Sequence, residues 1–212
     1  MKKFFSSVWF KCITCLLLIS LISGGLLSIL NDVLYVSSQE RTDRAIKSVY
    51  GKIPSEYETF LDIDANGTPI QLDTDSDKKI DGEIQKVYTV GDTATDSYEV
   101  IIKSTGFEGY KDGSISIWAL VKYENGNYVI TKVIMETFKK QTLMSNLGAS
   151  FYDAFLVDVT EAYENGENFT ASKGTTKYNN PVSGATFSAN AGNNAVNCII
   201  EYLGTTDLGG AN

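Results

Sequence analysis

The stretch 114–136, SISIWALVKYENGNYVITKVIME, holds two strand-like runs joined by Asn125-Gly126. From Ser114 to Tyr123 the odd positions are apolar, which is the two-residue period of a β-strand. Asn-Gly is the preferred pair for a two-residue hairpin turn, because both turn positions need a positive φ. We therefore expect Tyr128–Glu136 to pair back antiparallel on Ser114–Tyr123.

Further elements are expected before this hairpin. A strand at Tyr98–Lys103 is predicted to break at Gly106, and a polar, turn-rich stretch from Asp62 to Glu83 encloses one short strand at Ile70–Leu72. Apolar residues at near-helical spacing predict a helix that starts at Asp32. It should end before Ile53-Pro54, since the residue before a proline avoids the helical region.

Beyond the hairpin, apolar residues at helical spacing predict helices at Met144–Val157 and Ser188–Leu203. Helix, antiparallel strands and helices in this order predict an α+β fold with an antiparallel or mixed sheet flanked by helices. We expect three parts, namely an anchor at 1–36, a membrane-proximal helix with an acidic turn-rich segment at 37–95, and a main domain at 96–205.

Residues Cys12 to Asn31 are uncharged, and at about 1.5 Å per residue they would cover about 30 Å, one hydrocarbon core. Lys2, Lys3 and Lys11 precede this stretch, so the positive-inside rule places the amino terminus in the cytoplasm and the rest of the chain outside. The stretch is long for a signal core and no small-x-small cleavage site follows it, which favours an uncleaved single-pass anchor in the cell membrane. A cleavable signal peptide is the alternative.

Charge and composition exclude several classes of function. The 212 residues include 18 basic and 26 acidic side chains; three of the basic ones and only Asp32 of the acidic ones lie before residue 37, which leaves the external part near −10. Nucleic acid needs clustered cations and is not an expected partner. The chain has no histidine, which excludes histidine-dependent nucleophile systems, zinc sites and haem ligation. Cys198 is the only external cysteine, so the external part forms no internal disulfide.

The loop before the last predicted helix, Asn179 to Ser188, consists of small residues and a proline. Free N–H groups and the positive end of the helix dipole collect at such a start, so it suits a phosphate group. Gly184 would let the backbone approach closely, and Thr186 or Ser188 would cap the helix. Read from the residues alone, the same pattern also describes an ordinary capped helix start.

Ser183-Gly184-Ala185-Thr186 resembles the Ser/Thr-Gly-Ala-Thr signature of the FMN-binding domain family, which includes flavin-carrying subunits of the Rnf ferredoxin:NAD oxidoreductase and of the sodium-pumping NADH:quinone oxidoreductase. The residues 106–110 with the following strand look like the Gly-Tyr-Gly-Gly region of that family. The segment 141–148 is similar to its Glu-Thr-Pro-Gly-Leu-Gly segment, although the Pro-Gly pair is missing. Asn180 stands where the family usually has Asp.

The resemblance implies that a flavin transferase attaches the FMN half of FAD to Thr186 through a phosphoester. It also implies which other residues hold this covalent FMN: Ser183, Gly184, Ala185, Phe187, Thr142, Leu147 and Gly148. The chain would then be an extracytoplasmic electron-transfer relay, one subunit of an Rnf-type ion-translocating complex with other membrane subunits as partners, and no self-sufficient enzyme. A stand-alone FMN carrier for extracellular electron transfer and a non-redox anchored binding module are the alternatives.

A second pattern lies in the acidic stretch. Asp62, Asp64, Asn66 and Asp73 occupy the first, third, fifth and twelfth places of a calcium-loop spacing, with Gly67 at the sixth. Pro69 stands at the usually apolar eighth place, and Asp replaces the bidentate Glu of the last. A weak cation site and a solvated acidic turn both fit this pattern.

Overall fold

The computed structural model describes residues 8–55, 57–62, 68–95, 97–124, 126–141, 144–148, 151, 178–179, 182–206 and 208; for 32–34, 58–62, 127 and 145 it describes the backbone only. The chain forms two compact units, residues 1–42 and 43–212.

The first unit consists largely of α2, Val8–Leu34. Its stretch Val8–Asn31 is the one helix among the described residues that is long and apolar enough to cross a bilayer, and a signal sequence near an amino terminus has the same properties. The expected apolar helix is therefore confirmed.

The predicted continuous helix from Asp32 is wrong, because residues 35–37 are not helical and a separate helix, α3, spans Ser38–Tyr50. Ser37 Oγ accepts the N–H of Glu40 at 3.0 Å, and such a cap starts a new helix. At the other end Gly51, with a φ of 93°, donates its N–H to the carbonyl of Lys47 at 3.0 Å. A glycine in this conformation terminates a helix, so α3 ends before Ile53-Pro54 as expected.

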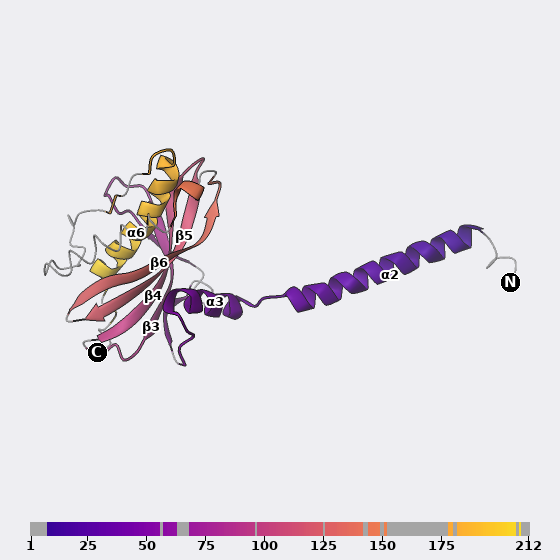
Figure 1. Ribbon diagram of the computed structural model, residues 1–212, viewed down its shortest axis with the longest axis horizontal. Helices are drawn as coiled ribbons and strands as arrows, with labels where there is room; N and C mark the ends of the chain where they lie inside the picture. Colours follow the sequence, from indigo (N-terminus) through magenta and orange to yellow (C-terminus); the bar gives the residue numbers. More distant parts are fainter. Residues whose placement is uncertain are drawn as a thin grey trace. The chain divides into compact units, whose positions relative to one another are not determined.

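The second unit is built on one antiparallel sheet of six strands, in the order β1-β3-β4-β5-β6 with β2 also paired to β3 (Figure 1). The α+β prediction is confirmed. Strands from both sides of residue 95 share this sheet. Their bounds are β1 Glu58–Asp62, β2 Ile70–Leu72, β3 Gly82–Val90, β4 Ser97–Gly109, β5 Gly113–Glu124 and β6 Asn127–Lys139.

The predicted hairpin is confirmed, since β5 and β6 pair with Tyr123 opposite Tyr128, and Gly126 has a φ of 82°. The short strand β2 is also confirmed. Two strands, β1 and β3, were not predicted. In β3 a register shift between Ile84 and Lys86 interrupts the alternation, and polar Lys86 and Thr89 are buried, so the two-residue apolar period is hidden.

Both faces of the sheet are covered, which explains why β5 is apolar at odd and at some even positions. Ile115, Ile117 and their odd neighbours belong to the core cluster beneath α6, whereas Trp118 belongs to the cluster beneath α3. There Trp118 stacks on Tyr88 with ring centroids 6.4 Å apart, and Ile46 and Val49 of α3 pack against the pair.

The last helix, α6, spans Thr186–Thr205, so the predicted helix Ser188–Leu203 is confirmed with two more residues at each end. It lies along one face of the sheet (Figure 1). The predicted helix Met144–Val157 lies largely outside the described residues. Its first three residues form a 3₁₀ turn, η1, Met144–Asn146.

The predicted break at Gly106 is met only in part: β4 continues to Gly109, but its pairing with β5 is interrupted between Gly106 and Gly109. The glycine is needed for packing. A Cβ at Gly106 would overlap the carbonyl oxygen of Ala191 and the backbone nitrogen of Ala195. A Cβ at Gly82, one strand away, would lie 2.8 Å from Cys198 Sγ. The helix therefore touches the backbone of the sheet.

Polar bonds support this contact. Ser104 Oγ donates to the carbonyl of Ala195 at 2.8 Å, and Asn194 Nδ2 donates to the carbonyl of Phe107 at 3.2 Å. Buried Asn197 holds the chain on its way to α6: its side chain accepts the N–H of Tyr178 at 2.8 Å and donates to the carbonyl of Tyr178 at 3.0 Å. The Tyr178 hydroxyl donates to the carbonyl of Phe151 at 2.9 Å.

Gly106→Ala tests the helix contact. Its methyl group meets backbone on α6, so the full-length protein in detergent should lose about 2 kcal/mol or more of its free energy of unfolding. Gly148→Ala is the matched control, because nothing lies within 4 Å of its Cβ position. Urea unfolding followed by near-ultraviolet circular dichroism measures both. Equal midpoints for the two variants would contradict the contact.

Asn197→Ala removes both partners of the buried Tyr178 backbone, and an unsatisfied buried group is costly, so the expected loss is about 3 kcal/mol. Asn190→Ala changes an exposed residue of the same helix and should shift stability by no more than about 0.5 kcal/mol. Thermal melts of the two variants, measured side by side, give the comparison. A wild-type melting temperature in Asn197→Ala would show that the two bonds to Tyr178 do not stabilise the fold.

Candidate functional site

The loop before α6 turns sharply at the predicted attachment motif. The N–H of Ala185 donates to the carbonyl of Val182 at 3.1 Å, and Gly184 has a φ of 76°, a conformation that side chains disfavour. The helix begins at Thr186, and Ala185 is its N-cap. Ser183, Gly184 and Thr186 are exposed, while Ala185 is buried.

The predicted capping by Thr186 or Ser188 is wrong. Both residues lie inside the first turn, and Ala185 has no side-chain oxygen to offer. The hydroxyl of Ser188 is buried and donates to Gln141 Oε1 at 2.7 Å. The first N–H groups of α6 have no intrahelical acceptor, and its first turn holds no acidic residue. This start therefore attracts an anion.

Gln141 joins three segments at this point. Besides the bond from Ser188, its Oε1 accepts the N–H of Tyr110 at 3.3 Å, and its Nε2 donates to the carbonyl of Lys139 at 2.9 Å. The side chain is buried between two glycines, because a Cβ at Gly109 or Gly113 would overlap its Nε2. The β4–β5 turn, the end of β6 and the first turn of α6 thus meet at one amide.

Two exposed aromatic rings lie together at the first turn of α6. Phe187 is 60% exposed, and its ring centroid lies 6.3 Å from that of Tyr110, which is 36% exposed. The ammonium of Lys111 lies 5.3 Å from the Tyr110 ring centroid. The rings of Phe187 and Tyr110 form an apolar surface next to the first N–H groups of α6, which form a polar one.

The segment 144–148 reaches the same loop. The side-chain amide of Asn146 lies 3.5 Å from the Cβ position of Gly184. Leu147, predicted to line a cofactor, is buried in the core beneath α6, and Gly148 is exposed. Thr142, predicted to contact the cofactor, lies outside the described residues. The structure thus brings Phe187, Tyr110, Gln141 and Asn146 together around Ser183–Thr186, the motif that resembles the FMN-binding family.

Sequence reasoning did not nominate Gln141 or Tyr110. The signal for Gln141 is the pair Gly109 and Gly113, which leaves room for a side chain from a neighbouring strand. A second signal appears only in the backbone. Of six described non-glycine residues with positive φ, four flank this junction: Glu108, Lys111, Asp112 and Lys140. Such conformations persist where the surrounding structure holds them.

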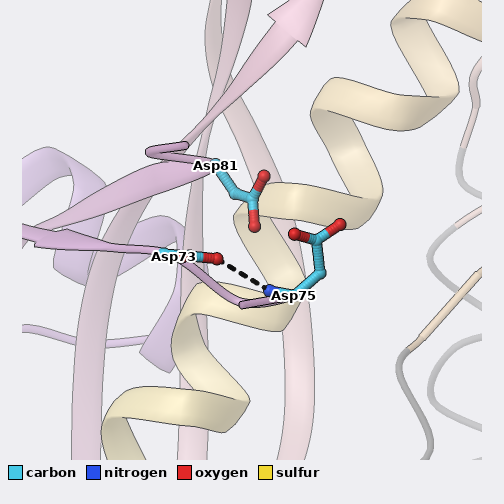
Figure 2. Close-up of side chains that lie close together, drawn as sticks. All are labelled: Asp73, Asp75 and Asp81. Atoms are coloured by element: carbon cyan, nitrogen blue, oxygen red, sulfur yellow. Dashed lines mark hydrogen bonds between the residues drawn. The ribbon is translucent and has the colours of Figure 1, made fainter. Parts of the chain in front are cut away.

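The acidic stretch forms a different cluster from the one expected. Of the predicted calcium ligands, Asp64 and Asn66 lie outside the described residues, and Asp62 pairs with Lys86 in the sheet. Asp73 instead meets Asp75 and Asp81, with oxygens within 4.8 Å of one another (Figure 2).

These carboxylates accept bonds from their own loop. Asp73 accepts the N–H groups of Ser76 at 2.6 Å and Lys78 at 2.8 Å, and Asp81 accepts both the N–H and the hydroxyl of Thr74 at 2.7 and 2.6 Å. The arrangement is that of a hydrogen-bonded acidic turn.

A pocket of about 880 Å³ lies elsewhere, where α3 ends beside the end of β3. Tyr50, Lys52, Tyr57, Thr89 and Asp92 are among the residues that line it. A hydrogen bond to Glu99, with smaller contributions from burial and from the charge of Glu99, raises the pKa of Tyr50. Its lining carries hydroxyl, amine and carboxyl groups, but none of them belongs to the segments that resemble the FMN-binding family. We therefore place the candidate site at α6.

Comparison with models of known protein families, with curated proteins and with solved structures gave no match in any of the three cases. Function must therefore be argued from the residues and their geometry.

Cys198 is buried against β3, and burial, followed by the charges of Asp81, Glu83 and Glu201, raises the pKa of its thiol. The thiol is therefore inert in the folded protein. In a Cys12→Ser, Cys15→Ser background, an aromatic disulfide reagent at pH 8 should label Cys198 only after unfolding. Because the unfolded thiol ionises near pH ~8.5, stability should also fall as the pH rises above that value. Rapid labelling of the folded protein would contradict this assignment.

Proposed function

We propose that this protein is a membrane-anchored flavoprotein that carries FMN covalently on Thr186 and relays electrons outside the cytoplasm. The observation that carries the proposal is the position of the Ser183–Thr186 motif. It ends on an exposed threonine at the first residue of a long helix whose N-cap has no side-chain oxygen.

The local geometry fits a phosphoester. Among the described residues the Thr186 hydroxyl has no hydrogen-bond partner, so it is free to react. The N–H groups of the first turn point toward the same end of the helix and suit phosphate oxygens. Gly184, with its positive φ, turns the chain tightly before the helix and has no side chain of its own to keep a phosphate away from the backbone.

The segments that carry the family resemblance come together in space, which is the second support. Residue Tyr110 belongs to the first segment, Gln141 and Asn146 to the second, and Phe187 follows the motif itself. Contacts join each of them to the loop or to the start of α6. A chance match of four residues would not require this convergence.

The attachment reaction balances with FAD as the co-substrate of a flavin transferase. The Thr186 oxygen attacks the phosphorus of the FMN half, a phosphoester forms, the anhydride bond of FAD breaks, and AMP leaves. The hydroxyl proton passes to a base of the transferase or to water. This chain supplies the nucleophile and the donors around it.

When bound, the flavin supplies reversible electron transfer, while the protein holds and orients it. The phenyl ring of Phe187, the residue after Thr186, and the phenol of Tyr110 offer a stacking surface at the first turn of α6. Lys111, next to the Tyr110 ring, places a positive charge at that surface. A covalent link prevents loss of the cofactor on the open side of a membrane.

In this proposal α2 is an uncleaved anchor, and the unit from residue 43 onward faces the extracytoplasmic side. Other membrane subunits of an Rnf-type complex would then be the electron partners. A stand-alone carrier for extracellular electron transfer uses the same site and differs only in those partners.

The pocket beside α3 favours a second candidate, an anchored extracellular binding module without redox chemistry. Its volume of about 880 Å³ lies within the range of small-molecule sites, and its lining mixes tyrosines with Lys52 and Asp92. This candidate gives no role to the exposed Thr186 and the strained junction beside it, so we place it second.

Thr186→Ala tests the proposal. In cells that also produce a flavin transferase, the full-length wild-type protein should show an ultraviolet-excited fluorescent band after denaturing electrophoresis, because only covalent flavin survives. Thr186→Ala should lose the band completely, whereas the matched control Ser183→Ala, which removes the other exposed hydroxyl of the motif, should still show a band.

Fluorescence retained in Thr186→Ala would exclude this residue as the attachment point. A dark wild-type band beside a fluorescent reference flavoprotein would sink the flavin proposal and favour the binding module.

A further inference from the structure

The buried amide of Gln141 makes three hydrogen bonds near the start of α6. It bonds to the first turn of α6, to the β4–β5 turn and to the end of β6, as described above. Its partners on the two turns are Ser188 and Tyr110. Tyr110 is part of the proposed flavin surface, and Ser188 lies two residues after Thr186.

We propose that Gln141 is a positioning residue: it fixes the Tyr110 ring against the start of α6, so that Thr186 and the stacking surface hold one geometry. The inference rests on the proposed function, but it concerns a residue to which the flavin does not need to bond. Gln141 acts through Ser188 and through the β4–β5 turn.

The hydrogen bonds of Gln141 hold a strained stretch of backbone in place. Glu108 near the end of β4, Lys111 and Asp112 in the β4–β5 turn, and Lys140 beside Gln141 have positive φ angles of 51–64°. Each of these conformations is disfavoured for a residue with a side chain, so the turn would relax without external bonds. Gln141 supplies a bond to Tyr110, inside that turn, and another to Lys139, beside Lys140.

The same amide also withdraws one competing hydroxyl from the first turn of α6. Three hydroxyl residues lie in or near the motif: Ser183, Thr186 and Ser188. Ser188 is buried and its proton is committed to Gln141 Oε1 at 2.7 Å. Within the first turn of α6, only Thr186 therefore presents a free hydroxyl.

Gly109 and Gly113 leave the space that the side chain of Gln141 occupies. A Cβ at Gly109 or at Gly113 would overlap Gln141 Nε2, so the two glycines leave a slot between β4 and β5 that the amide fills. A leucine at position 141 has a similar volume and no polar atoms. It would fill the slot and lose all three bonds.

The test uses full-length Gln141→Leu and Ser188→Ala, coexpressed with a flavin transferase. The first variant removes every bond of the amide, and the second removes only the bond to α6, so it remains informative if the first folds poorly. Gln71→Leu, the same substitution at an exposed position of β2, is the matched control. Attached flavin per protein, the visible circular dichroism of that flavin, and amide hydrogen exchange are measured in all.

We expect attached flavin to fall roughly tenfold in Gln141→Leu, because a small misplacement of a reacting group is that costly. The remaining flavin should lose most of its visible circular dichroism, a signal that requires a fixed ring. Exchange should rise roughly fivefold both at Tyr110 and in the first turn of α6, since one lost bond loosens both partners. In purified Gln141→Glu the visible circular dichroism and the slow exchange should be kept at low pH, where the protonated carboxyl can donate to the carbonyl of Lys139, and both should be lost as the carboxyl ionises.

Unchanged flavin yield and circular dichroism in Gln141→Leu and Ser188→Ala would overturn the positioning role and leave the flavin proposal standing. If the wild type carries no flavin, the proposed function fails, and hydrogen exchange decides alone. Joint loosening of Tyr110 and α6 then supports the link, and independent or unchanged exchange overturns it.

Discussion

The contact on which the rest of this structure depends is the approach of α6 to the bare backbone of the sheet. Gly106 and Gly82 have no side chains, and Ala191 and Ala195 present only methyl groups, so helix and strands meet at backbone distance. Every other feature near Thr186 follows from this approach. It places the first turn of α6 beside the β4–β5 turn, which holds Tyr110, and beside Gln141 after β6, and it places the buried core beneath the remaining turns.

Close packing alone would produce only an ordinary helix start, and the local chemistry makes this one different. Helices commonly begin with a residue whose side-chain oxygen satisfies the first N–H groups, but Ala185 leaves them free. The hydroxyl that could compete, that of Ser188, turns inward to Gln141. What is left is a positive helix end that carries an exposed threonine and the exposed ring of Phe187. The second exposed ring, Tyr110, comes from the neighbouring β4–β5 turn, where Lys111 and Asp112 hold a strained backbone conformation. Natural proteins retain such violations of local preference chiefly where function needs them.

Elements with clear local signals could be predicted from the sequence, and those shaped by distant contacts could not. The Asn125-Gly126 hairpin and the stripe of Ala195, Ile199 and Leu203 are local patterns, and both elements are present. β3 was missed because a bulge at Ile84–Lys86 shifts its alternation and because its buried polar residues find partners only in the folded sheet. Gly106 was read as a strand break because glycine is a weak strand former, yet its role is set by Ala191, far along the chain. Among the site residues, Ser183–Thr186 could be found because the motif is continuous in the sequence. The role of Gln141 could not, because its hydrogen bonds form only when three separate segments meet in the fold.

The mass of the protein extracted from its own membrane tests the central claim most directly. Trypsin cuts after Lys177 and at no later position, so Thr186 lies in one carboxyl-terminal peptide, 178–212. The account predicts that this peptide is heavier than its amino acids by one FMN less water, and that fragmentation places the addition on Thr186. An unmodified peptide, from cells in which other proteins do carry covalent flavin, would contradict it.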